Sequence, residues 1–171
     1  MCKKKRPECR VRLYEIASNE KSKYWKMFAR HHYLSHSHNN AARCFVATLN
    51  GEIALYTSIL SFPHPVVKDT WKEHRTVVLP DYQGIGLSRI IGDFIGDMLQ
   101  KQGKHYITTT SNPARIATLK RNDKWICTRI GRSSSGSGSG KIQNKHIKGS
   151  TSCERITVSF KYIGNGKIQQ R

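Results

Sequence analysis

The sequence predicts a single domain of the α/β (α+β) class. Segments with the two-residue hydrophobic period of strands alternate with segments of helical period, and an Asn-Gly pair joins two of the strand-like segments. The chain has 171 residues, 37% of them hydrophobic, which is enough for one core and too little for two comfortable ones. No apolar run reaches the ~18 residues that a membrane span needs. We therefore expect a soluble globular protein with no membrane partner.

The first half of the chain is expected to form a strand, a helix and a β-hairpin. Residues 10–17 alternate as a short strand does, and residues 20–34 carry apolar side chains on one helical face without Gly or Pro. Residues 44–49 and 53–60 are rich in β-branched and aromatic side chains. Asn50-Gly51 between them tolerates the positive φ of a tight turn, which predicts the hairpin.

The second half is expected to continue the alternation of strands and helices. A charged loop over residues 68–73 precedes a short strand at 76–79, which Pro80 ends. After a glycine-rich turn at 83–86, apolar residues recur at helical spacing from Ile90 to Leu99. The remaining predicted elements are a strand at 106–110, a helix at 113–121 that begins with proline, and strands at 125–130 and 156–163.

The predicted boundaries leave polar, basic segments around one domain. We expect a basic arm at residues 1–8, one domain over 9–164, and a tail at 165–171. Inside the domain, residues 133–140 read Ser-Ser-Ser-Gly-Ser-Gly-Ser-Gly, a composition typical of flexible connectors. We therefore expect a flexible loop over residues 132–150 that interrupts the domain and does not end it.

The net charge of +19 is concentrated in the flanks of the chain. Residues 1–30, 31–100, 101–148 and 149–171 carry net charges of +7, −1, +10 and +3. Basic flanks around a neutral middle are what a basic face added to an ordinary core would give, and such a face attracts polyanions. We expect a nucleic acid or ribonucleoprotein partner, and the alternative is a merely solubilising surface.

The cysteines and histidines give weaker signals. Five cysteines without a Cys-x-x-Cys pair are most simply reduced thiols. The basic run Lys3–Arg6 is not followed by the apolar segment of a secretory signal, so we expect a cytoplasmic protein. Candidate zinc ligands are His31, His32, His36, His38 and Cys44, because imidazole and thiolate are the usual ligands of zinc. No cysteine pair completes such a site, so we expect no metal.

A strand, a tight glycine turn and a helix follow one another over residues 77–88. This order predicts an anion site, because glycines let the backbone approach a ligand closely and the first N–H groups of the helix point at it. The segment has neither the Gly-x-x-x-x-Gly-Lys-Ser/Thr of a P-loop nor the full Gly-x-Gly-x-x-Gly of a dinucleotide site. On these residues alone it is a phosphate-binding candidate.

The segment Gln83-x-x-Gly86-x-Ser88 resembles the acetyl-CoA motif of the GCN5-related N-acetyltransferases. Ser88 departs mildly from the Gly or Ala of that motif, and the order of elements is similar over nearly the whole chain. The resemblance extends to basic family members of phage or mobile-element type. It implies a mixed sheet splayed at the motif strand with helices on both faces. It also implies that acetyl-CoA or another acyl-CoA is held by Val78, Leu79, Gln83, Gly84, Ile85, Gly86, Leu87, Ser88 and Asn112.

The same resemblance implies direct attack of an amine on the thioester, with a base to remove a proton. In many members the base is a Glu eleven residues before the Gln, and Lys72 stands at that position here. Glu73 and His74 are the candidates, and strand alternation favours His74, which shares the face of residue 72. His31 and His32 are expected to line the acceptor side, since the first helix borders it in this family.

The tyrosine that commonly protonates the thiolate has no counterpart near Leu119, where its position falls. The leaving group is then protonated by water, by Lys120 or Arg121, or by Tyr106 or Tyr162, or the protein is an inefficient enzyme. No choice among these follows from the sequence.

These features predict an acyl-CoA-dependent N-acyltransferase. The charge points to an acceptor amine on or near a nucleic acid, such as a modified DNA base, an aminoacyl-tRNA or a ribosomal component. The alternatives are an N-acetyltransferase of small molecules or proteins, and a catalytically weak nucleic-acid-binding module on the same fold. The sequence indicates no oligomeric state.

Overall fold

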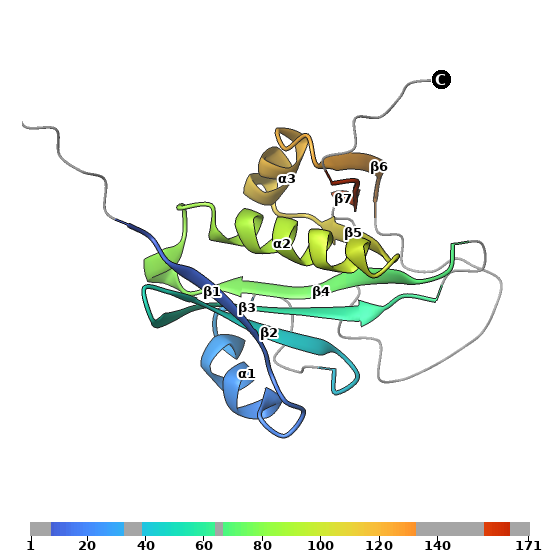
Figure 1. Ribbon diagram of the computed structural model, residues 1–171. Helices are drawn as coiled ribbons and strands as arrows, with labels where there is room; N and C mark the ends of the chain where they lie inside the picture. The colour runs from blue at the N-terminus through green and yellow to red at the C-terminus, as the bar shows by residue number, and fades with distance from the viewer. Residues whose placement is uncertain (1–7, 33–38, 64–66, 133–155, 165–171) are drawn as a thin grey trace, which may run out of the picture.

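The computed structural model describes residues 8–32, 39–63, 67–132 and 156–164. The predicted arm except Glu8, the Ser/Gly loop except Arg132, and the predicted tail lie outside these ranges. Seven strands and three α-helices alternate along the described chain (Figure 1). The strands are β1 (Val11–Glu15), β2 (Arg43–Leu49), β3 (Glu52–Ser61), β4 (Thr70–Val78), β5 (His105–Thr110), β6 (Trp125–Arg132) and β7 (Ile156–Tyr162), and the helices are α1 (Lys21–Ala29), α2 (Leu87–Lys101) and α3 (Pro113–Lys120).

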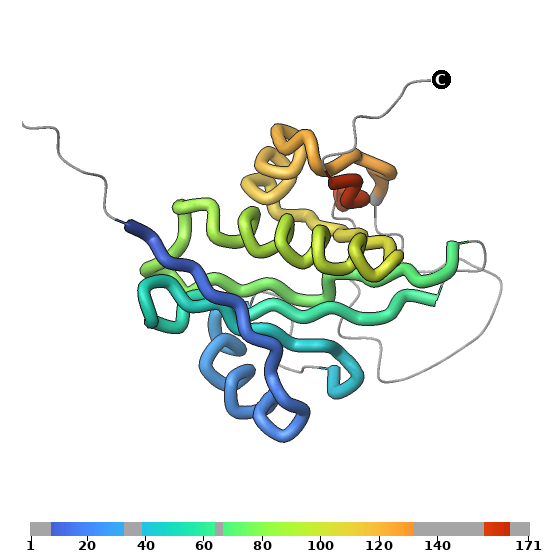
Figure 2. The backbone as a smooth tube through the Cα atoms, viewed as in Figure 1, coloured from blue at the N-terminus to red at the C-terminus, as the bar shows by residue number. Residues whose placement is uncertain are grey.

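All seven strands form one mixed sheet in the order β1-β2-β3-β4-β5-β7-β6. Only β4 and β5 are parallel, and every other pair is antiparallel. As the backbone trace shows, α1 lies on one side of the sheet and α2 on the other (Figure 2). The predicted mixed sheet with helices on both faces is confirmed. Among the described helices none combines the length and the hydrophobicity that a bilayer-spanning segment needs.

The two faces of the sheet bury separate apolar clusters, as the two-residue period of a strand requires. In β2, Phe45 and Ala47 belong to the larger cluster, which α2 and α3 cover. Cys44 and Val46 between them belong to the smaller cluster, which holds Trp25 and Phe28 of α1. Because both faces are buried, β2 is apolar from Cys44 to Ala47 and β3 from Ile53 to Tyr56.

The predicted hairpin is confirmed, with β2 and β3 joined at Asn50-Gly51. Both turn residues have positive φ, 53° at Asn50 and 99° at Gly51. The predicted helix after the first strand is shorter than the pattern suggested, because α1 ends at Ala29.

The charged loop expected at residues 68–73 is wrong, because Thr70 to Glu73 are part of β4. Two charged residues of this segment, Lys72 and Glu73, lie within the strand and contact other parts of the fold. Lys72 lies over the Phe62 ring at 5.3 Å, and Glu73 forms an ion pair with Arg115. Trp71 is covered by Arg43 and Lys104, whose charged groups lie 5.5 and 5.1 Å from its ring.

The feature that positions the site is the parting of β4 from β5. The two strands pair only from Thr70 to Lys72 and from His105 to Ile107. Beyond these residues β4 stays with β3, whereas β5 continues along β7 from Ile107 to Thr110. A V-shaped opening therefore lies between β4 and β5, with its apex next to Glu73, as the predicted splayed sheet requires.

Candidate active site

A cleft of about 560 Å³ occupies the opening between β4 and β5. Its walls come from β4, from the loop before α2 with the start of that helix, from β5, from α3 and from the end of α1. The lining residues are His31, His32, Glu73, His74, Arg75, Thr76, Val77, Val78, Tyr82, Gln83, Gly84, Gly86, Leu87, Ser88, Thr108, Thr109, Thr110, Asn112, Ala114, Arg115 and Thr118. The cleft thus brings together most of the residues expected to bind the coenzyme. Leu79 and Ile85 are the two that do not line it.

The glycine-rich turn forms an open cradle of backbone N–H groups. No acceptor in the described part of the chain lies within hydrogen-bond distance of the N–H groups of residues 84–88. Gly84 and Gly86 have φ of 81° and 82°, which only glycine adopts easily, and a Cβ at either would meet no atom within 4 Å. The cradle stands at the N-terminus of the 15-residue helix α2, where an anion is stabilised.

The end of β4 supplies one further polar backbone group. The N–H of Leu79 donates to the carbonyl of Ala54 at 2.9 Å, so it is not available to a substrate carbonyl. In an antiparallel pair alternate residues face the partner strand, so the backbone of Val78 faces away from β3 and toward the opening. The Gln83 side chain donates to the Val78 carbonyl at 3.0 Å, which ties the turn to the strand.

Glu73 lies at the apex of the cleft in an ion pair with Arg115, at 3.3 Å between Oε2 and Nη2. The two side chains are 10% and 12% exposed, and Thr76 donates to Glu73 Oε1 at 2.5 Å. Burial alone would raise the pKa of Glu73, but the Arg115 charge and hydrogen bonds from Thr76 and Thr108 hold it below the ordinary value. Glu73 is therefore a stable anion and a poor proton acceptor at neutral pH.

His74 lines the same cleft as Glu73, so the expectation that alternation separates the two residues is wrong. The register shifts here, because Ser58 pairs with Arg75 whereas Ile59 pairs with Glu73. His74 is the extra residue of this β-bulge, which breaks the alternation and brings neighbouring side chains to one side.

The end of α1 and the middle of β4 give the cleft a cationic wall. Arg75 Nη1 lies 3.1 Å from His32 Nδ1, and its guanidinium lies over the Trp25 ring at 5.5 Å. Because guanidinium is only a donor, the His32 nitrogen facing it accepts. Arg30 donates to His31 Nε2 at 3.1 Å in the same way. His31 and His32 thus line the cleft as expected, each with an arginine beside it.

The tyrosines considered as proton donors lie away from the cleft. Tyr106 is 2% exposed inside the larger cluster, and burial raises its pKa well above the ordinary value. Tyr162 donates to Asp97 on α2, and burial together with that carboxylate raises its pKa. Neither these residues nor Lys120 and Arg121 belong to the lining. Among the described tyrosines only Tyr82 lines the cleft.

Asn112 caps α3, because its side-chain oxygen accepts from the Arg115 N–H at 3.1 Å. Its side-chain NH₂ is the group left for a ligand in the cleft. His36 and His38 lie outside the described ranges. Within those ranges no three His, Cys, Asp or Glu side chains come together as metal ligands would.

Sequence reasoning did not identify Arg75, Arg115, Thr76 and Thr108 as site residues. Arg115 lies 42 positions from its partner Glu73, and no local pattern signals a contact of that range. One signal was present for Arg75 and Thr76, since both belong to the strand that leads into the glycine turn.

A sheet that opens beside a strand–glycine turn–helix motif, with N–H groups at the turn that face no acceptor among the described residues, is a site that suits the diphosphate of a coenzyme. The family model of the acetyltransferase (GNAT) family matches residues 10–122, and the chain belongs to this family. No curated protein matches the chain in sequence.

Solved acetyltransferases share the fold at low sequence identity. The ribosomal-protein-S18-alanine N-acetyltransferase of Escherichia coli aligns with a TM-score of 0.63 and 18% identity, over 95% of this chain and 99% of that one. A Bacillus subtilis acetyltransferase in complex with CoA aligns with a TM-score of 0.58 and 12% identity, over 91% of this chain and 98% of that one. The Salmonella typhimurium protein yncA, with its cofactor acetyl-CoA, aligns with a TM-score of 0.61 and 13% identity, over 94% of this chain and 98% of that one.

The family uses acetyl-CoA, and the residues present here fit it. The cradle at 84–88 suits the diphosphate because it offers N–H donors and free space where any Cβ would intrude. The outward-facing backbone of Val78 suits the amide groups of the pantetheine arm. These assignments are the basis of the following prediction.

Replacing Gly86 by alanine is expected to weaken acetyl-CoA binding about tenfold or more. A Cβ at this φ is strained and intrudes on the cradle. Gly103→Ala is the matched control, because Gly103 has a similar φ of 71° but lies at the other end of α2. Calorimetric titration should show normal affinity for Gly103→Ala. Equal losses in both variants would contradict the cradle.

Glu73→Gln is expected to lower the free energy of unfolding by about 3 kcal/mol, because it leaves a buried guanidinium uncompensated. Glu15→Gln, which breaks the more exposed pair with Arg43, should cost less than about 1 kcal/mol. Because the folded-state pKa of Glu73 is lowered, its contribution is present above the ordinary value of 4.5 and is lost as pH falls below it. Urea unfolding across pH should show that difference between wild type and Glu73→Gln. A constant difference would contradict the ion pair.

Proposed function

We propose that this enzyme transfers an acetyl group from acetyl-CoA to an amine on, or next to, a nucleic acid. The observation that carries the proposal is the charge of the cleft wall opposite the cradle. The guanidinium of Arg75 gives this wall its positive charge, and the imidazoles of His31, His32 and His74 also line the cleft. Glu73 is the one carboxylate among the described lining residues, and Arg115 neutralises it. Such a wall attracts an acceptor that carries phosphate and repels a polyamine.

The chain as a whole supports the same acceptor. A net charge of +19 far exceeds what one diphosphate requires. The remaining cations favour association with a polyanion, because each phosphate contact releases counterions. An acetyltransferase for small cationic amines would instead be served by an acidic cleft. The nucleic-acid proposal covers a modified DNA base, an aminoacyl-tRNA and a ribosomal component.

His74 is the proposed general base. Acetyl-CoA supplies a thioester whose carbonyl carbon an amine can attack. The chain's part is to hold the amine close and to take its proton. Glu73 is held as an anion by Arg115, His32 accepts from Arg75 and His31 accepts from Arg30. His74 also lines the cleft, and it is the bulged residue of β4 next to Glu73.

The backbone N–H of Val78 is the proposed donor to the carbonyl oxygen on which charge develops. The N–H of Val78 faces the opening, whereas the N–H of Leu79 donates to the carbonyl of Ala54. Proton return to the leaving thiolate is assigned to water or Tyr82, because the other tyrosines and the cations weighed from sequence lie outside the cleft.

Label transfer distinguishes the acceptor classes directly. The protein is incubated with acetyl-CoA radioactive in the acetyl group and with bulk cellular DNA, aminoacylated transfer RNA, ribosomes or spermidine. We expect acid-insoluble label that nuclease releases, or label carried by the ribosomes. Label that protease alone releases from protein outside the ribosomes would place the acceptor on a free protein, and label only in spermidine would indicate a small-molecule enzyme. Either of these results contradicts the proposal.

His74→Gln is expected to lower the rate of that transfer about a hundredfold or more, which is the usual contribution of a positioned base. His105→Gln is the matched control, because His105 is exposed at the start of β5 and does not line the cleft. Calorimetry should show unchanged acetyl-CoA affinity in both variants. Full activity of His74→Gln would remove His74 from the mechanism.

A further inference from the structure

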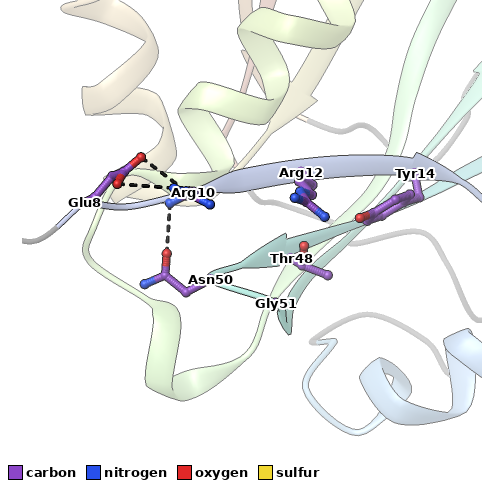
Figure 3. A pocket seen from close by; sticks show the side chains of 7 residues that line it. All are labelled: Glu8, Arg10, Arg12, Tyr14, Thr48, Asn50 and Gly51. Atoms are coloured by element: carbon purple, nitrogen blue, oxygen red, sulfur yellow. Dashed lines mark hydrogen bonds and ion pairs between the residues drawn. The ribbon is translucent and has the colours of Figure 1, made fainter.

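A second concavity of about 470 Å³ lies along β1, away from the cleft (Figure 3). It is a groove lined by Glu8, Arg10, Arg12, Tyr14, Thr48, Asn50 and Gly51, and none of these residues belongs to the cleft lining. The residues drawn in Figure 3 come from β1, from the segment just before it, from the end of β2 and from the β2–β3 turn. This groove has no part in acetyl transfer as derived above.

The groove lies on the face of the sheet that carries α1. Arg12 pairs with Thr48 and Tyr14 pairs with Val46 across β1 and β2. Directly opposed residues of antiparallel strands point to the same face. Because Val46 packs in the cluster that holds α1, Arg12 and Tyr14 also point to that face.

The groove combines a cation with an exposed aromatic ring. Arg10 is paired with Glu8, which leaves its charge largely cancelled. Arg12 is exposed and makes no ion pair with any described residue. Tyr14, two residues along the same face, is 50% exposed. Asn50 and Thr48 add side-chain amide and hydroxyl groups at the floor.

Exposed cations continue from the groove side toward the cleft along α1. Lys23, Lys26 and Arg30 are exposed, whereas Trp25 and Phe28 face the sheet. Arg30 is the last of these cations and contacts His31, which lines the cleft. In the sequence, four basic residues at 3–6 come just before the groove. The groove and the exposed cations of α1 therefore share one face of the sheet.

We propose that the groove of Arg12 and Tyr14 binds an unpaired segment of the nucleic acid that carries the acceptor, with a phosphate on Arg12 and a base stacked on Tyr14. The inference rests on the proposed nucleic-acid acceptor and adds the surface that holds it. A cationic groove with an exposed ring is the arrangement that binds single strands, since every base offers a face for stacking. In a duplex those faces are covered by neighbouring bases, so an unpaired segment is the occupant.

The test measures binding of a short fluorescein-labelled DNA single strand by anisotropy at several salt concentrations. Arg12→Ala should weaken binding and lower the salt slope by about 0.7, the value for one phosphate of a single strand. Tyr14→Ala should weaken binding about fivefold or more with an unchanged slope. Lys101→Ala, on α2 across the sheet, is the matched control and should bind as wild type does.

The outcomes separate this inference from the proposed function. If both groove variants bind the single strand as wild type does, or if Lys101→Ala loses as much, the groove is not the binding surface. If wild type prefers the matching duplex, the unpaired occupant is wrong. In each case label transfer to nucleic acid can persist and the proposed function stands. If wild type binds no nucleic acid and transfers no label to it, both proposals fail. Acetyl-CoA affinity measured in each variant verifies that the fold is intact.

Discussion

The function of this protein depends on the parting of two parallel strands. β4 and β5 share three residue pairs, from Thr70–His105 to Lys72–Ile107, and then separate because β4 stays with β3 and β5 with β7. A closed sheet would satisfy every backbone group along β4. Parting leaves the backbone of Val78 facing an opening whose far end is the cradle before α2. The strand therefore ends at a place that can bind the polar groups and the diphosphate of a coenzyme.

The apex of the opening is held by side chains instead of backbone. Glu73 on β4 and Arg115 on α3 form an ion pair between the two diverging walls. The Thr76 hydroxyl donates to Glu73 and forms a second hydrogen bond with the Thr57 hydroxyl. Gly92 of α2 leaves room for the guanidinium, since a Cβ there would lie 3.0 Å from Arg115 Nη2. Fixing Glu73 as an anion removes the obvious carboxylate base, and the bulge at His74 brings an imidazole into the same cleft. The proposed base His74 and the cation Arg75 thus stand at the same local irregularity of β4.

The sequence allowed correct prediction of the parts of this fold that local patterns determine. The hairpin at Asn50-Gly51, the glycine-rich turn, α2 and the proline that begins α3 were all predictable from turn chemistry and hydrophobic period. The start of β4 was misread as a loop because Glu73 is neutralised by Arg115, which is far along the chain, and Lys72 lies over the Phe62 ring. The facing of His74 was misread because a bulge, which periodicity does not show, shifts the register. The groove beside Tyr14 depends on strand pairing across β1 and β2, which a single sequence does not give.

The central claim is that the free N–H groups of the cradle and of Val78 hold the coenzyme. Hydrogen exchange of individual amides, followed by NMR with and without acetyl-CoA, tests it most directly. The account predicts slower exchange and shifted resonances for Val78, Gly84 and Gly86 on binding, with little change in exchange at Leu79, whose N–H is already bonded to Ala54. Unchanged exchange at the cradle, with the changes found at the groove of β1 or elsewhere, would contradict it.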